Sequence, residues 1–321
     1  MASAQAPMGT KQRDAGILTV LIAMGANFLV SVAKSGAAVL TGSASMTAEA
    51  AHSWADTGNQ VFLYIAEKRS DKPRDKTHPM GYGREAYVWS MFAAFGLFTA
   101  GAVVSIMHGI QTLIAPEPAG DFHIAYIVLA IAFVLEGISF VQAFRQARTM
   151  AGRYRRNTLE HVVKSSDPTL RAVFAEDSAA LIGIAIAFAG IFLHQVTGST
   201  VPDAVGSILV GILLGVIAVI LIDRNRRFLV GQSVSGQTEQ LALEMLLTHE
   251  EIERVTYLHL EFVGPDRLYL VAAVDIAGNR REREVALALR LVERELESRD
   301  LIEEAVLTLA TSDEPSLRPG R

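Results

Sequence analysis

Six long apolar segments occupy most of the first 222 residues of this chain of 321. As helices, they are each long enough to cross a hydrocarbon core of about 30 Å. The chain is 50% hydrophobic with a mean hydropathy of +0.30, which is typical of a membrane protein that carries a polar part. We therefore expect a six-helix transmembrane domain over residues 15–231, with spans at residues 15–40, 46–66, 86–113, 122–143, 171–196 and 202–222.

The Lys and Arg residues between these spans indicate the orientation of the bundle. Residues 67–84 carry six of them and residues 145–171 carry seven. The connections near residues 41–46, 114–122 and 194–201 carry none. By the positive-inside rule both basic loops and both termini are cytoplasmic. With no transit segment before the first span, we expect a bacterial plasma membrane protein.

The composition changes after residue 231. From Gln232 onward, 18 Asp and Glu outnumber 10 Lys and Arg, which gives a net charge of −8. Hydrophobic patterning there predicts the order αββαβ, a small α+β domain of the open ferredoxin-like kind over residues 232–312. The expected elements are helices at 238–248 and 280–299 and strands at 255–263, 268–276 and 301–310. Residues 1–14 and 313–321 are expected to be disordered tails. No basic patch coincides with this domain, so no nucleic-acid partner is expected.

A polar stripe interrupts the second apolar segment. Its members share one helix face, at offsets 0, 3, 4, 7, 10 and 11: Glu49, His52, Ser53, Asp56, Asn59 and Gln60. Ionisable groups are costly inside a span and indicate an ion or substrate site there. His52 and Asp56 are one turn apart, so an imidazole and a carboxylate can bind the same metal ion. The alternative is a polar cluster that only packs helices together.

Two acids in the fifth segment, Glu176 and Asp177, offer a second half of this site. Adjacent helical residues point about 100° apart, so only one of them is expected to face His52 and Asp56. Such a mixed nitrogen and oxygen site suits Zn²⁺, Mn²⁺, Fe²⁺ or Co²⁺. The chain has no cysteine, which excludes thiolate ligands. Lys34 and Glu136 are isolated charges in other spans, and either pair together or support the site.

Five motifs resemble the cation diffusion facilitators, a family of metal/proton antiporters with six spans and a cytoplasmic αββαβ domain. They are LTGSASMTAEAAHSWADTGNQ (40–60), THPMGYGREAYVWS (77–90), LEGISF (135–140), SSDPTLRAVFAEDSAALIG (165–183) and VPDAVGSILVGILLG (201–215). The resemblance covers nearly the whole chain. It implies a homodimer that exchanges a divalent metal for protons by alternating access.

The resemblance also implies a ligand set. The family's pair on span two falls on His52 and Asp56, and its acid on span five falls on Asp177. The family's other span-five ligand, four residues earlier, is Val173 here. This departure is similar to the branch of the animal mitochondrial zinc transporter. It leaves Glu176, Asn59 or a water as the fourth ligand, with Glu176 as the first choice.

Two further metal sites of the family are only partly matched. Its loop site falls on Asp75 and His78, a pair that by itself is more typical of a solvated loop, and a further histidine is replaced by Tyr82. Its site in the soluble domain falls at best on His259 and Asp313. The other histidine positions are Ala272 and Thr311, so we expect that site to be absent or weakened.

We therefore expect an exporter of Zn²⁺, or alternatively of Mn²⁺, Fe²⁺ or Co²⁺, that works as a secondary transporter and needs no cofactor. Two rival functions come from other classes. One is a membrane protein that senses metal without transporting it. The other is an intramembrane metallohydrolase, which is disfavoured because the chain has no HExxH motif and its acids are used as ligands.

Overall fold

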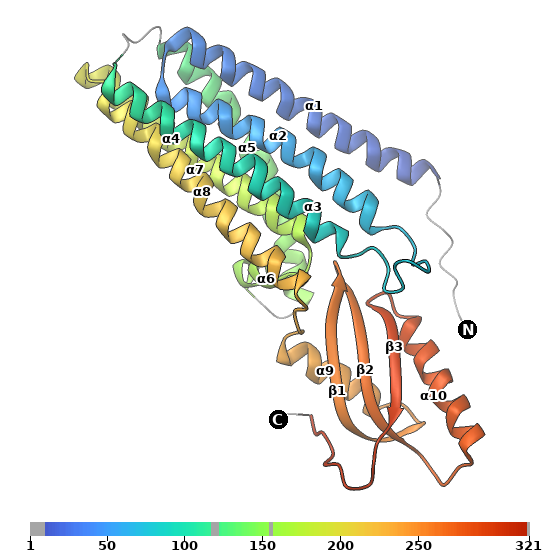
Figure 1. Ribbon diagram of the computed structural model, residues 1–321. Coiled ribbons are helices and arrows are strands. Elements are labelled where there is room, and N and C mark those ends of the chain that lie inside the picture. The colour runs from blue at the N-terminus through green and yellow to red at the C-terminus, as the bar shows by residue number, and fades with distance from the viewer. Residues whose placement is uncertain (1–9, 117–121, 154–156, 320–321) are drawn as a thin grey trace. The chain divides into compact units, whose positions relative to one another are not determined.

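A computed structural model of the chain describes residues 10–116, 122–153 and 157–319, with side chains from residue 24 onward except that of Arg153 (Figure 1). By its internal contacts the chain forms two compact units. The helix bundle comprises residues up to 65, 90–165 and 169–222. The second unit comprises residues 66–89, 166–168 and those from 223 onward.

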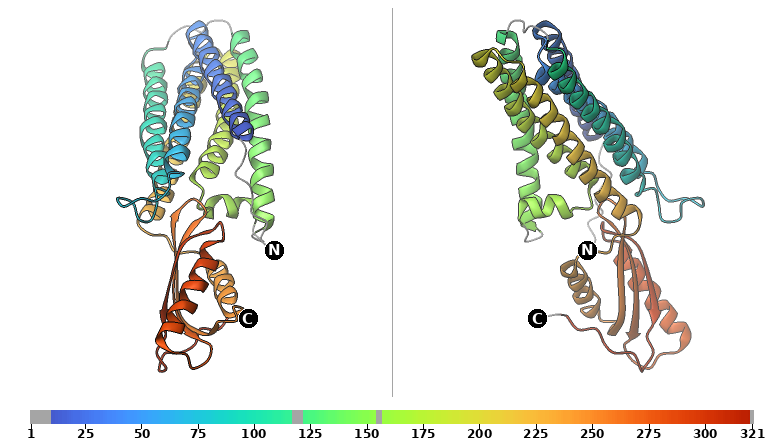
Figure 2. Two further views of the ribbon diagram at one scale, coloured as in Figure 1. Left: turned by 90° about the vertical axis from the view of Figure 1, so that its right-hand side faces the viewer. Right: turned by 60° about the vertical axis from the view of Figure 1, so that its left-hand side comes forward.

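Long helices make up the first part of the chain (Figure 2). They are α1 (Thr10–Thr41), α2 (Ala44–Ser70), α3 (Glu85–Ala93) continued through a π-helical turn (Ala94–Phe98) into α4 (Thr99–Ile114), α5 (Phe122–Arg153), the short α6 (Thr158–Lys164), α7 (Pro168–Thr197) and α8 (Val201–Leu229). Five of the six long helices described are apolar enough to cross a membrane by composition. The sixth, α2, is long enough but carries the polar stripe.

The start of α2 is fixed by a carboxylate from α8. Gly42 adopts a positive φ of 62° and separates α1 from α2. Asp203 then accepts hydrogen bonds from the backbone N–H groups of Ala44 (2.7 Å) and Ser45 (3.1 Å). These groups have no partner within their own helix, so the buried carboxylate of Asp203 satisfies them.

Glycines allow α4 and α8 to approach closely. A Cβ at Gly211 would lie 2.9 Å from the carbonyl oxygen of Ala102 and 2.6 Å from the side chain of Ile106. A Cβ at Gly109 would lie 2.7 Å from the carbonyl oxygen of Ala204. The GxxxG spacing in the last span therefore forms an intramolecular contact, in which small residues let backbones meet.

The second unit contains the predicted αββαβ domain. Its elements are α9 (Gly236–Leu247), β1 (Ile252–Gly264), β2 (Arg267–Ile276), α10 (Glu282–Glu297) and β3 (Ile302–Leu309). The sheet order is β1-β2-β3, with β1 antiparallel and β3 parallel to β2. Both helices share one hydrophobic core with alternate strand residues such as Leu258, Leu270 and Leu307. The predicted fold class, a helical bundle followed by a small α+β domain, is confirmed.

The basic loop at 67–84 lies against this sheet within the second unit. Arg84 pairs with Glu261 of β1 at 2.5 Å. Arg267 of β2 lies 3.7 Å from Asp71 and 3.3 Å from Glu303. Gly83 packs so closely on Gly264 that a Cβ on either residue would lie 2.7 Å from the other's Cα. Ion pairs and a close glycine contact therefore join the basic loop to the sheet.

The described residues reach into both predicted tails. Residues 1–9 of the predicted N-terminal tail lie outside the described residues, and α1 begins at Thr10 rather than near residue 15. Residues 313–319 contain no helix or strand but are bonded to β1: the Leu317 N–H donates to the Val255 carbonyl at 2.8 Å. Arg254 also donates to the carbonyl of Glu314 at 2.7 Å. These two hydrogen bonds join Glu314 and Leu317 to β1.

Candidate metal transport site

The polar stripe of α2 is buried among the helices of the bundle. His52, Asp56 and Asn59 are 1%, 6% and 1% exposed. Nε2 of His52 lies 3.5 Å from Oδ2 of Asp56, as their spacing of one helical turn requires. The imidazole and the carboxylate therefore point to the same place in the bundle, whereas Trp54, on the opposite face, is 44% exposed.

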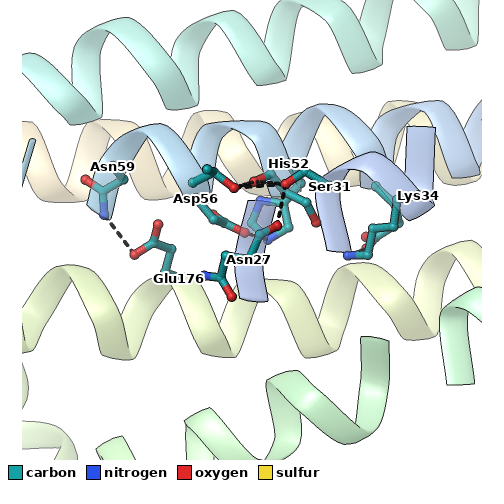
Figure 3. Close-up of polar contacts among 10 residues, drawn as sticks. Asn27, Ser31, Lys34, His52, Asp56, Asn59 and Glu176 are labelled. Atoms are coloured by element: carbon teal, nitrogen blue, oxygen red, sulfur yellow. Dashed lines mark hydrogen bonds and ion pairs between the residues drawn. The ribbon is translucent and has the colours of Figure 1, made fainter. Parts of the chain in front are cut away.

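Glu176 is the acid of α7 that faces this pair (Figure 3). Its Oε2 accepts a hydrogen bond of 2.8 Å from Nδ2 of Asn59. The neighbouring Asp177 turns toward α5, where its Oδ2 accepts a hydrogen bond of 2.9 Å from Ser139. The two acids diverge as adjacent residues of a helix must.

Several nitrogen and oxygen atoms between α2 and α7 that could bind a metal ion have no hydrogen-bond partner. They are both ring nitrogens of His52, Oδ1 of Asp56 and Oε1 of Glu176. Buried polar atoms are normally satisfied, so a group of unsatisfied ones indicates a site for a ligand. Across the described residues, no three His, Asp or Glu side chains already form a cluster that could hold a metal ion.

Lys34 of α1 forms its ion pair with Glu49, and it also interacts electrostatically with Glu136 of α5. Its Nζ lies 2.8 Å from Oε2 of Glu49, and both side chains are fully buried. Ser31, one turn before Lys34, donates to the carbonyl of Ser53 at 2.8 Å and so joins α1 to α2. The sequence did not lead us to predict the Lys34–Glu49 pair. Both residues lie on polar faces of neighbouring helices, and packing these two faces against each other would have suggested it.

Asp75 and His78 take part in a local hydrogen-bond network. Oδ1 of Asp75 accepts bonds from the Thr77 hydroxyl (2.6 Å) and from the Thr77 and His78 N–H groups (2.8 Å each). Its Oδ2 accepts from the Tyr82 hydroxyl at 2.8 Å. These hydrogen bonds, of which that from the Thr77 side chain has the largest effect, hold the pKa of Asp75 well below its usual range. The Tyr82 ring, where the family has histidine, stacks on His78 with centroids 4.0 Å apart.

In the αββαβ domain, His259 and Ala272 have different surroundings. His259 pairs in register with Val271, and its Nε2 lies 3.9 Å from Oε2 of Glu261. Ala272 is fully buried in the core beneath the sheet. A side chain at position 272 would therefore enter the core rather than join His259. Asp313 has its pKa lowered by the Thr311 side chain.

Residues 20–230 match the cation efflux transmembrane domain. The chain belongs to the cation diffusion facilitator family. The matched segment contains α2 and α7 with all the bundle residues of the candidate site. Together with the apolar helices, it makes the chain a multi-pass membrane protein.

Three relatives illustrate the range of similarity. Metal tolerance protein C4 of Arabidopsis thaliana is 34% identical over 81% of this chain and 57% of its own length. The proton-coupled zinc antiporter SLC30A9, mitochondrial, of Homo sapiens is 32% identical over 81% of this chain and 46% of its own length. Magnetosome protein MamB of Magnetospira sp. (strain QH-2) is 26% identical over 71% and 72%. The chain thus spans about half the length of the first two.

Proposed function

We propose that this cation diffusion facilitator exports a divalent transition metal from the cytoplasm in exchange for protons. Zn²⁺ is the expected substrate, because the chain is similar to proteins whose names include a proton-coupled zinc antiporter. Mn²⁺, Fe²⁺ and Co²⁺ are the alternatives that a nitrogen and oxygen site also accepts. The residence in a bacterial plasma membrane and the cytoplasmic termini remain part of this proposal.

The observation that carries the proposal is the set of unsatisfied atoms on His52, Asp56 and Glu176. They belong to two helices, they are buried in a membrane bundle, and they are of the types that bind Zn²⁺. We assign these three as ligands, with Glu176 drawn toward the other two by the cation. Asn59 then orients the carboxylate of Glu176 by its hydrogen bond. Asp177 supports the site indirectly, by joining α7 to α5 through Ser139.

Proton exchange follows from the chemistry of these ligands. A metal ion needs a neutral imidazole and ionised carboxylates, so protons compete with it for the same atoms. Metal enters from the cytoplasm, the bundle rearranges, and external protons displace the metal outward. His52 is the natural carrier, because an imidazole titrates near neutral pH under ordinary conditions. The side chains of His52, Asp56 and Glu176 therefore bind metal and protons in turn.

Uptake into inverted vesicles under an imposed pH gradient tests this function. Zn²⁺ uptake is expected for the unchanged chain, and competition by Mn²⁺, Fe²⁺ and Co²⁺ ranks the alternatives. His52→Ala should abolish uptake, while Glu160→Gln should not, since Glu160 is an exposed acid paired with Lys164 on α6. Binding of Zn²⁺ without any uptake by the unchanged chain would favour the sensor instead.

A further inference from the structure

The Lys34–Glu49 ion pair has no role in the proposed ligand set, yet it lies next to it. Glu49 is three residues before His52 on α2, toward the end at Ala44 that the Lys and Arg pattern places outward. Figure 3 shows Lys34 on the far side of His52 from Asn59 and Glu176. The pair therefore lies between the candidate metal site and the proposed outer side of the membrane.

An ion pair is an expensive way to hold α1 and α2 together here. Both side chains are 0% exposed, with Nζ and Oε2 2.8 Å apart. Removing two charges from water costs several kcal/mol, and apolar residues of similar volume often stabilise a fold as well or better. A charged pair is better suited to a place that is dry in one conformation and reached by water in another.

The helices are packed tightly beside Glu49 and one turn further outward. Oε1 of Glu49 has no hydrogen bond and is directed at Gly183 of α7, where any Cβ would overlap it. One turn further outward, Ser45 lies against Gly190 of α7 and Gly206 of α8. On the other side of His52, by contrast, α2 meets α7 through the long side chains of Asn59 and Glu176. The described conformation is thus closed on the Ala44 side.

We propose that Lys34 and Glu49 form the outward gate of the transport site. The pair closes the path from His52 to the outer side and separates when the bundle opens outward. Lys34 also interacts electrostatically with Asp56, so a divalent cation bound at Asp56 repels the ammonium group and favours separation. This inference rests on the proposed function and on the orientation given by the basic loops.

The absence of cysteine from the chain makes a direct test possible. Ser53, 3% exposed and one turn from Glu49 on the side of the metal site, is replaced by cysteine as a reporter. Right-side-out vesicles without added metal are treated with a membrane-impermeant thiol reagent. Lys34→Met and Glu49→Gln should each raise the labelling rate from outside at least about tenfold, because loss of one partner leaves a buried charge or dipole unsatisfied and disfavours the closed form.

Two further variants distinguish a gate from a general loosening of the helix bundle. The charge-swapped chain, Lys34→Glu with Glu49→Lys, should return the rate to that of the parent. Val32→Ala, a position on α1 that is 46% exposed, should leave it unchanged. Outside labelling at the Val32→Ala level in both single variants would overturn the gate, as would a rise that the swap does not reverse. The labelling does not depend on transport. It therefore tests the gate, whereas Zn²⁺ uptake tests the metal site, and either proposal can be wrong without the other.

Discussion

The two adjacent acids of α7 have different partners, although the sequence presents them as equals. Glu176 faces Asn59 and Asp56 of α2, whereas Asp177 is bonded to Ser139 of α5. The family pattern points to Asp177, and the geometry favours Glu176 as the ligand. A helix alone predicts that the two must diverge, but not which one faces inward, because that depends on how α7 is rotated against its neighbours.

We predict that Glu176→Gln weakens Zn²⁺ binding more than Asp177→Asn. Loss of a direct carboxylate ligand should cost more than about 100-fold in affinity, while loss of an indirect one should cost 10- to 100-fold or less. Isothermal titration of the purified chain in detergent gives both values under identical conditions. Equal losses would place both acids on the metal, and a larger loss for Asp177→Asn would reverse the assignment.

A second prediction concerns Asn59, whose amide donates to Glu176 at 2.8 Å. Asn59→Ala should weaken Zn²⁺ binding about tenfold by releasing that carboxylate, as is typical of groups that orient a ligand. In the Glu176→Gln background the same change should have little further effect. Additive losses in this double-mutant cycle would show instead that Asn59 acts on its own.

At the scale of the elements, the contact of α4 with α8 depends on glycine. Gly211→Ala should lower the thermal unfolding midpoint, because the new Cβ would meet the Ala102 carbonyl at 2.9 Å and Ile106 at 2.6 Å. A cost of about 1–3 kcal/mol is typical of overpacking. Gly215→Ala is the matched control, since its Cβ would lie 3.8 Å from Ala102, an ordinary contact. Equal midpoints for the two variants would contradict the packing account.

The elements themselves were largely predictable from hydrophobic patterning. The strand expected at 268–276 is β2 at Arg267–Ile276, and the helix expected at 280–299 is α10 at Glu282–Glu297. The π-helical turn at Ala94–Phe98 was not predicted, because AFGLF is as apolar as the rest of its span and carries no local signal. The Asp203 cap on α2 was also missed, since it joins residues about 160 positions apart.

At the scale of the whole molecule, we propose that the face of the C-terminal sheet opposite its two helices binds a second copy. Tyr257, His259, Tyr269 and Val271 lie on strand positions alternate to those in the core, and Tyr257 is 53% exposed. Tyr257→Asp with Val271→Asp should raise the dimer dissociation constant at least about tenfold, because like charges would meet in an apolar interface. Analytical ultracentrifugation in detergent measures this.

The same experiment separates this dimer from one held by metal. Two of the histidine positions of the family's site in this domain are Ala272 and Thr311 here. Chelator should therefore leave the dimer of the unchanged chain intact. Dissociation in chelator alone would show that metal ions join the subunits.

The most direct test of metal/proton exchange at the α2–α7 site records both ions at once. Zn²⁺ uptake and internal pH are followed in inverted vesicles carrying the unchanged chain or His52→Ala with Asp56→Ala. The unchanged chain should take up Zn²⁺ while protons leave, and the double variant should move neither ion. Zn²⁺ uptake without proton movement, or uptake that survives the double variant, would contradict the account.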